Sequence, residues 1–247
     1  MKSLICAVGA GLVALCVCTA TAQASVVIGG TRVVFPAKDG EVTVRLTNQG
    51  SKPALVESWI DSGDAQSTPD KVDVPFLVTP PLFRLEPNKD QSLRIVATPA
   101  QLPVDRESLF WLNVLEVPPK PTSLEGESKN TLQFAVRSRL KLFYRPPNLP
   151  GDPLKAPESL TWKAMSGGES IALEIRNPTP YYVTLTTITV NSGGAIYSAD
   201  SGMISPLSTL RVAVKDMPHA PSSGASIDYT ALNDYGASIA LKGIVSP

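Results

Sequence analysis

The sequence predicts an all-β protein made of two sandwich domains, and three observations lead to that fold class. First, no long stretch keeps the period of an amphipathic helix, and short runs with apolar residues at every second position dominate instead. Second, Gly, Pro, Asn and Asp separate these runs at regular intervals, which is typical of antiparallel sandwiches. Third, the segment 145–153 holds four prolines in nine residues. A strand cannot cross such a segment, so it predicts a stiff elbow between two domains.

Seven strand candidates precede the elbow and seven follow it. The first set comprises residues 25–35, 41–48, 54–60, 75–85, 92–97, 108–117 and 132–144. The second set comprises residues 159–165, 170–177, 181–191, 195–199, 208–214, 225–232 and 238–245. Each set is sufficient for one immunoglobulin-like sandwich, and we place these domains at 25–145 and 146–247.

The candidate strand 75–85 contains the sequence Thr79-Pro80-Pro81. Proline removes a donor from a β-ladder, so we expect an edge, a bulge or a strand that switches sheets at this point. A cis peptide bond before Pro80 or Pro81 stays open at this stage.

The first 24 residues have the features of a secretory signal peptide. Lys2 precedes an uncharged apolar run at 4–17, and Ala22-Gln23-Ala24 places small residues where a signal peptidase reads them. We therefore expect export with cleavage after Ala24. The apolar run is shorter than the roughly 20 residues of a membrane-spanning helix, so we expect no membrane insertion. The three cysteines, Cys6, Cys16 and Cys18, all lie in this segment, which leaves the mature chain without disulfides.

Charge and composition argue against several function classes. Lys2 is the only charged residue of the first 24, so the mature chain carries 21 basic and 22 acidic side chains, and we expect no nucleic-acid partner. The single histidine, His219, follows a proline in a loop pattern and is the only imidazole that could serve a nucleophile as a base. No cluster of His and Cys predicts a metal site, and no pattern predicts a cofactor. We therefore expect a protein that is not an enzyme.

The run 132–144 combines an apolar row with a basic row. Leu132, Phe134 and Val136 face one side of an extended strand, directly after a polar loop at 118–130. One interpretation is that this row is ordinary core. The other is that the row is exposed and that a partner covers it by strand addition.

Four cations, at positions 137, 139, 141 and 145, have the opposite parity to the apolar row. A solvated polar face explains Arg137 and Arg139. Lys141 and Arg145 fall where the first domain ends, and cations at such a crease are kept only with partners. Arg32 is an isolated cation in a strongly apolar strand, which is costly unless an anion meets it.

Six motifs taken together resemble one known family. They are TRVVF at 31–35, TPPLFRLEP at 79–87, DRESLFWLNVLEVPP at 105–119, LKLFYRP at 140–146, NPTPYYVTL at 177–185 and NDYG at 233–236. Their order and spacing resemble the periplasmic pilus chaperones, the PapD-like family, over essentially all of the mature chain. The resemblance implies two immunoglobulin-like domains in a boomerang arrangement, located in the periplasm. The short loop at 118–130 and the absent cysteines are similar to the short-loop subclass of the family.

This resemblance implies a chaperone that binds, folds and caps pilus or fimbrial subunits by donating a β-strand, and that delivers them to an outer-membrane usher. It implies that Leu132, Phe134 and Val136 form the donated row. It implies that Arg32 and Lys141 grip the C-terminal carboxylate of the subunit. Val136 and Lys141 are five residues apart, so a bulge or a strong twist must intervene if both contact one subunit.

The resemblance further implies an inter-domain ionic trio of Glu107, Arg145 and Asp234, whose role is to orient the two domains. Breaking one member of such a trio is expected to destabilise the fold by leaving a charge unpaired.

Two rival functions remain at this stage. A secreted adhesin or structural subunit would use the row at 132–136 as core. A lectin or carbohydrate-active enzyme would need clustered aromatic residues, whereas Trp59, Trp111 and Trp162 are dispersed in patterns that predict core positions. The sequence does not identify the subunits, the usher or the pilus type, and it leaves open whether the free protein masks its donor row by self-association.

Overall fold

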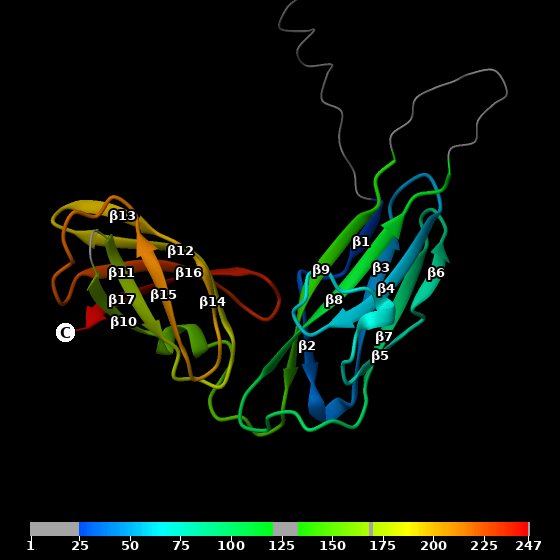
Figure 1. Ribbon diagram of the computed structural model, residues 1–247, viewed down its shortest axis with the longest axis horizontal. Coiled ribbons are helices and arrows are strands. Elements are labelled where there is room, and N and C mark those ends of the chain that lie inside the picture. Colours follow the sequence, from blue (N-terminus) through cyan, green and yellow to red (C-terminus); the bar gives the residue numbers. More distant parts are fainter. Residues whose placement is uncertain (1–24, 121–132, 168–169, 247) are drawn as a thin grey trace, which may run out of the picture.

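The computed structural model describes residues 25–120, 133–167 and 170–246. Figure 1 shows two β lobes that meet at one end and diverge from it, as the predicted fold class requires. The first lobe contains β1 to β9 and the second contains β10 to β17. Among the described residues, no helix is long and apolar enough to cross a membrane.

The first lobe is a sandwich of two sheets. The four-stranded sheet has the order β1-β3-β7-β5 and the five-stranded sheet has the order β2-β9-β8-β4-β6. The strands are β1 (Val26–Ile28), β2 (Arg32–Pro36), β3 (Glu41–Asn48), β4 (Ala54–Asp61), β5 (Phe76–Thr79), β6 (Leu82–Leu85), β7 (Asp90–Ala97), β8 (Ser108–Val117) and β9 (Val136–Arg145). Two short 3-10 helices, η1 (Ala37–Asp39) and η2 (Pro69–Lys71), lie between strands.

Two of the predicted strands cross from one sheet to the other. Of the three alternatives expected at Thr79-Pro80-Pro81, the structure shows the sheet switch, because β5 belongs to the four-stranded sheet and β6 to the five-stranded sheet. The bond between Thr79 and Pro80 is cis. The prediction of a single strand at 25–35 is wrong. The chain forms two strands there, because Gly29 and Gly30 separate β1 from β2, and the two strands join opposite sheets. The switch makes β2 an edge strand that pairs in parallel with β9.

The strand predicted at 132–144 begins later than expected. Pairing between β8 and β9 is continuous but ends at Glu116 opposite Val136. β8 itself ends at Val117, and Pro118, which follows it, has no N–H to donate to a ladder. Gln133, Phe134 and Ala135 therefore lie beyond the regular sheet.

Alternating side chains from both sheets fill the core of the first lobe. Phe76 lies at its centre, with its ring centroid 5.4 Å from that of Phe35 and 4.9 Å from that of Phe110. Leu140 and Leu142 extend this core along β9. The even positions of β9 therefore face inward and its odd positions face outward, as expected for a period of two.

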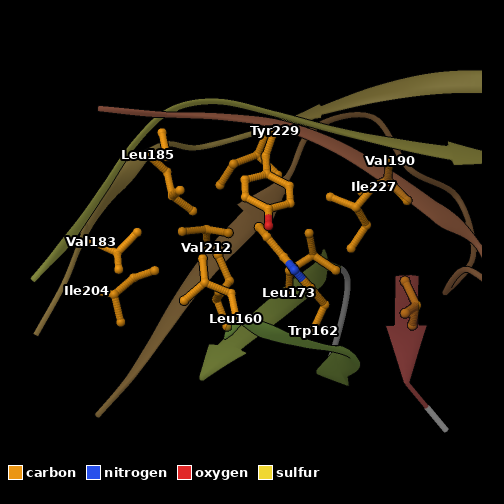
Figure 2. Packing of buried hydrophobic residues seen from close by; sticks show 14 of the residues in the cluster. Leu160, Trp162, Leu173, Val183, Leu185, Val190, Ile204, Val212, Ile227 and Tyr229 are labelled. Carbon is orange, nitrogen blue, oxygen red and sulfur yellow. The ribbon is translucent and has the colours of Figure 1, made fainter. Parts of the chain in front are cut away.

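The second lobe contains the remaining eight strands, in the order β13-β15-β11-β10-β17-β16-β12-β14 with a further pairing of β13 to β12. The strands are β10 (Thr161–Gly167), β11 (Ser170–Arg176), β12 (Val183–Ser192), β13 (Ala195–Ala199), β14 (Gly202–Ile204), β15 (Thr209–Val214), β16 (Ser226–Leu232) and β17 (Ser238–Ser246), with η3 (Ala156–Ser159) before them. Every strand predicted after the elbow is present, and β14 is an additional one. Figure 2 shows Trp162 beside Tyr229 in the core, with ring centroids 4.8 Å apart. The hydroxyl of Tyr229 donates to the carbonyl of Pro157 at 2.8 Å.

The elbow connects β9 directly to the second lobe. Pro146 is buried at its start. The Tyr181 hydroxyl lies 3.3 Å from the carbonyl oxygens of Leu149 and Gly151 and donates to them. These contacts hold the elbow against the base of the second lobe.

Candidate functional site

The parallel pairing of β2 with β9 places two predicted site residues side by side. Arg32 lies directly opposite Lys141 in the register, although 109 positions separate them in the sequence. Both side chains are half-buried. The guanidinium of Arg32 lies 5.7 Å from the ring centroid of Phe143, and the Lys141 ammonium lies 5.8 Å from that of Trp111. The sheet thus holds two like charges together at the edge of the first lobe.

These two cations have no carboxylate partner within ion-pair distance among the described residues. Burial lowers the pKa of Lys141, and the neighbouring charge of Arg32 lowers it further. Burial also lowers the pKa of Arg32, although the more distant Asp234 and Glu107 partly oppose this. The Nε atom of Arg32 is buried and makes no hydrogen bond. Such a pair is costly in the free protein and is suited to binding an anion.

A cleft of about 580 Å³ opens beside Arg32. Its walls come from β2, from β3 and from the loop that carries Asp234 and Tyr235 in the second lobe. Tyr235 is 82% exposed. Arg32 therefore lines a concave surface to which both lobes contribute, and Lys141 lies beside it on β9.

The three residues of the predicted trio come together at the junction of the lobes. Arg145 donates from Nε to Glu107 at 2.7 Å, and its two terminal nitrogens donate to Asp234 at 2.7 and 2.9 Å. The second oxygen of Glu107 accepts the backbone N–H of Tyr182 at 2.7 Å. Burial alone would lower the pKa of Arg145, but its hydrogen bonds to Asp234 and the charge of Glu107 raise the pKa above its ordinary value.

The loop that carries Asp234 has a defined conformation. The side-chain oxygen of Asn233 accepts the backbone N–H groups of Tyr235 and Ala237 at 3.0 and 2.9 Å. Gly236 has a φ of +81°, and a Cβ at this position would collide with the Thr31 side chain. The turn therefore requires glycine and rests on the residue that precedes Arg32.

Two members of the predicted donor row lie on the surface. Phe134 is 70% exposed and Val136 is 44% exposed, so neither is core, while Leu132 lies outside the described residues. Val136 has the parity of the core residues Leu140 and Leu142, and the row thus continues the inward face of β9 beyond the end of the sandwich. The register of β8 and β9 shows no irregularity from Val136 to Tyr144. Of the two alternatives, a bulge or a strong twist between Val136 and Lys141, the bulge is excluded, and the twist of the strand is left to bring both residues to one partner.

Comparison with known proteins identifies the family to which this architecture belongs. The PapD N-terminal domain of pili and flagellar-assembly chaperones matches residues 25–150, and the PapD C-terminal domain of pili assembly chaperones matches residues 155–242. The chain belongs to this family of chaperones. The matched regions meet at the elbow, between β9 and β10.

Relatives of the chaperone span most of its length. The chaperone protein FimB/FhaD of Bordetella pertussis is 48% identical over 219 residues, which cover 87% of this chain and 86% of that protein. The probable fimbrial chaperone YadV of Escherichia coli is 42% identical over 233 residues, which cover 92% of this chain and 94% of that protein. The crystal structure of YadV superposes with a TM-score of 0.76 at 38% identity, over 90% of this chain and all of that one. A Salmonella enterica structure, SafA pilin in complex with the SafB chaperone, has a TM-score of 0.71 at 31% identity, over 92% of this chain and 99% of that one.

Sequence reasoning missed one group of polar residues in the chaperone. Asp61 and Asn113 are buried on the outward face of the five-stranded sheet, where they bind Arg137 and Arg139. The expectation of a solvated face for these two arginines is therefore wrong. The core position expected for Trp111 is also wrong, since its ring lies 4.2 Å below the Arg139 guanidinium on the outward face. An available signal was the carboxylate of Asp61 directly after the apolar pair Trp59-Ile60, at the end of the strand candidate 54–60.

Proposed function

We propose that this chaperone binds pilus subunits in the periplasm, caps them with the start of β9 and delivers them to an outer-membrane usher. The observation that supports this most directly is the pair of uncompensated cations, Lys141 on β9 and Arg32 on the neighbouring β2, next to the exposed apolar row at the start of β9. A C-terminal carboxylate of a subunit would bind both cations through charge-assisted hydrogen bonds. That anchor would fix which residues of the subunit lie opposite Phe134 and Val136.

The donated row supplies most of the binding energy in this proposal. A subunit that lacks one strand exposes an apolar groove and unpaired strand edges, and both favour aggregation. Leu132, Phe134 and Val136 would fill the groove, and each large side chain contributes roughly 1.5–3 kcal/mol when buried. Release requires only a more stable replacement strand from another subunit, so the proposed mechanism involves no catalytic step and no nucleotide.

Export and domain organisation belong to the same proposal. Residues 1–24 act as a cleavable signal peptide, residues 25–145 form the strand-donating domain, and residues 146–247 form the second domain. Arg145, Glu107 and Asp234 fix the angle between the two domains so that both flank the bound subunit. The residues of the described part contain no cluster of three metal-ligating side chains, and the proposal needs no cofactor.

Co-expression tests the proposed function. The chaperone is produced in a bacterial periplasm with the secreted proteins encoded beside it, and the material purified with it is weighed by mass spectrometry. We expect one small immunoglobulin-like subunit at a ratio of one to one. If the chaperone elutes alone and those proteins stay soluble without it, the proposed function is wrong.

Substitution of the donor row gives a specific prediction. Phe134→Asp combined with Val136→Asp should abolish subunit capture, because two charged side chains would have to enter an apolar groove. The free energy of unfolding should fall by about 1 kcal/mol or less, because both side chains are exposed in the free chaperone and the main cost is the new carboxylate at position 136 opposite Glu116. Capture is measured by co-purification and stability by urea denaturation. Ala135→Asp, on the opposite face of the same segment, is the matched control and should keep more of the captured subunit.

A further inference from the structure

A buried carboxylate lies behind the outward face of β9. Asp61, at the end of β4, is 1% exposed and accepts hydrogen bonds from Arg139 Nε at 3.1 Å and from Asn113 Nδ2 at 2.7 Å. The backbone N–H of Gly63 donates to it at 2.7 Å. Burial would raise the pKa of Asp61, but these hydrogen bonds together hold it below its ordinary value. Asp61 is therefore a fixed negative charge in direct contact with β9.

Asn113 extends the contact to a second arginine. Its side-chain oxygen accepts from Arg137 Nε at 3.0 Å and from Arg137 Nη2 at 2.7 Å. Arg137 also donates to the carbonyl of Ala65 at 3.0 Å and lies 3.9 Å from Asp61. Each guanidinium covers an indole ring, Arg137 that of Trp59 at 4.7 Å and Arg139 that of Trp111 at 4.2 Å. Asp61 thus neutralises Arg139, whereas Arg137 is held in place mainly by uncharged acceptors and an indole ring.

The next cation along the same face differs from these two. Positions 137, 139 and 141 project from one face of β9 at steps of about 7 Å, because side chains alternate along a strand. Arg137 and Arg139 share Asp61, whereas Lys141 has Arg32 beside it and no carboxylate within ion-pair distance among the described residues. Arg139, the cation next to Lys141 in the row, is therefore neutralised by a direct ion pair, and Lys141 is not.

We propose that Asp61 sets the register of subunit capture by neutralising Arg139, so that the carboxylate of the subunit binds only at Lys141 and Arg32. This inference rests on the proposed function, since it concerns the same anchor. If Arg139 were uncompensated, the carboxylate could bind one step earlier, and the subunit would shift by two residues along β9. Because side chains alternate along a strand, a shift of two residues keeps every donor side chain pointing toward the subunit. Phe134 and Val136 could therefore fill the wrong positions of the subunit groove without any steric penalty from facing the wrong way. Asp61 is a positioning residue in this scheme and does not contact the subunit.

Two variants distinguish this role from a purely structural one. Asp61→Asn keeps the shape of the side chain but leaves Arg139 uncompensated. Asp61→Asn combined with Arg139→Met removes both charges together. If Asp61 is only structural, the double variant should bind the subunit in the same register as the single variant. If Asp61 acts by neutralising Arg139, the double variant should regain the wild-type register.

The register is read by disulfide trapping, which the cysteine-free mature chain permits. Ala135→Cys is introduced into each variant, and single cysteines are scanned along the edge strand of the subunit captured in the co-expression experiment. We expect the Asp61→Asn variant to trap a position two residues away from the wild-type position in about half of the complexes or more. The double variant should trap the wild-type position, with affinity within about threefold of wild type.

Each other outcome has a defined meaning. The inference is overturned if Asp61→Asn traps only the wild-type position, or if the double variant keeps the shift. If Asp61→Asn does not fold, the test rests on the double variant. A loss of affinity for the subunit of about tenfold or more in the double variant would show that Arg139 itself contacts the subunit, and it would overturn the inference. A wild-type chaperone that captures no subunit would instead refute the proposed function, and this inference with it.

Discussion

Lys141→Met is expected to lower the affinity for the subunit by about 100-fold, because truncating one partner of a desolvated charge pair typically costs about 2–5 kcal/mol. The same variant should be more stable than wild type by about 1 kcal/mol when free, since a half-buried cation beside Arg32 is replaced by an apolar side chain of similar length. Affinity is measured by titration with the purified subunit, and stability by urea denaturation of the free chaperone. Opposite signs in the two measurements would show that the anchor is maintained for binding at the expense of stability.

The control for this variant is Lys163→Met, which removes an exposed lysine from β10 in the second lobe. It should leave affinity unchanged and change stability by less than about 0.5 kcal/mol. If Lys141→Met binds the subunit as tightly as Lys163→Met does, Lys141 is not the anchor.

The stability difference should also depend on pH. Because the folded pKa of Lys141 is lowered, the unfolded chain binds more protons than the folded chain between that value and the ordinary lysine value of about 10.4. The wild-type chaperone therefore gains stability as the pH rises through this window, and the advantage of Lys141→Met should shrink. A constant difference from pH 7 to pH 10.5 would contradict the lowered pKa. Urea denaturation at several pH values provides the measurement.

Arg145→Met should reduce the free energy of unfolding by about 3–5 kcal/mol, because it leaves buried Glu107 and half-buried Asp234 without their cation. The loss of the bidentate contact to Asp234 should also loosen the two lobes relative to each other. Thermal unfolding measures the first effect, and small-angle X-ray scattering measures the second as an increase in the radius of gyration.

Arg211→Met provides the comparison, since Arg211 forms an ion pair with Glu174 on an exposed face of the second lobe. Pairs of that kind contribute about 0–1 kcal/mol. Combining Arg145→Met with Glu107→Gln and Asp234→Asn should recover part of the loss by removing the unpaired charges. The trio does not stabilise the junction if Arg145→Met proves as mild as Arg211→Met.

The sequence by itself determined the all-β class, the elbow and the positions of nearly all strands. The reason is that a period of two and the local restrictions of proline and glycine act within a few residues. The division of 25–35 between two sheets at Gly29 and Gly30 was missed, because alternation continues through such a crossing and carries no information on which sheet a residue joins. The family resemblance supplied the anchor, donor and trio residues, and the structure brings Arg32 to Lys141, and Glu107 and Asp234 to Arg145.

Only the tertiary structure decided which cations of β9 are available to a partner. Arg137, Arg139 and Lys141 share one face at equal spacing, and the sequence separated Lys141 from the two arginines only by its place near the end of the first domain. What distinguishes them is Asp61, which lies 78 positions from Arg139 in the chain and reaches it because β4 and β9 both pair with β8. Long-range strand pairing is set by the packing of the whole sandwich, so no local pattern around β9 could have shown that a buried carboxylate neutralises Arg139 and leaves Lys141 without one.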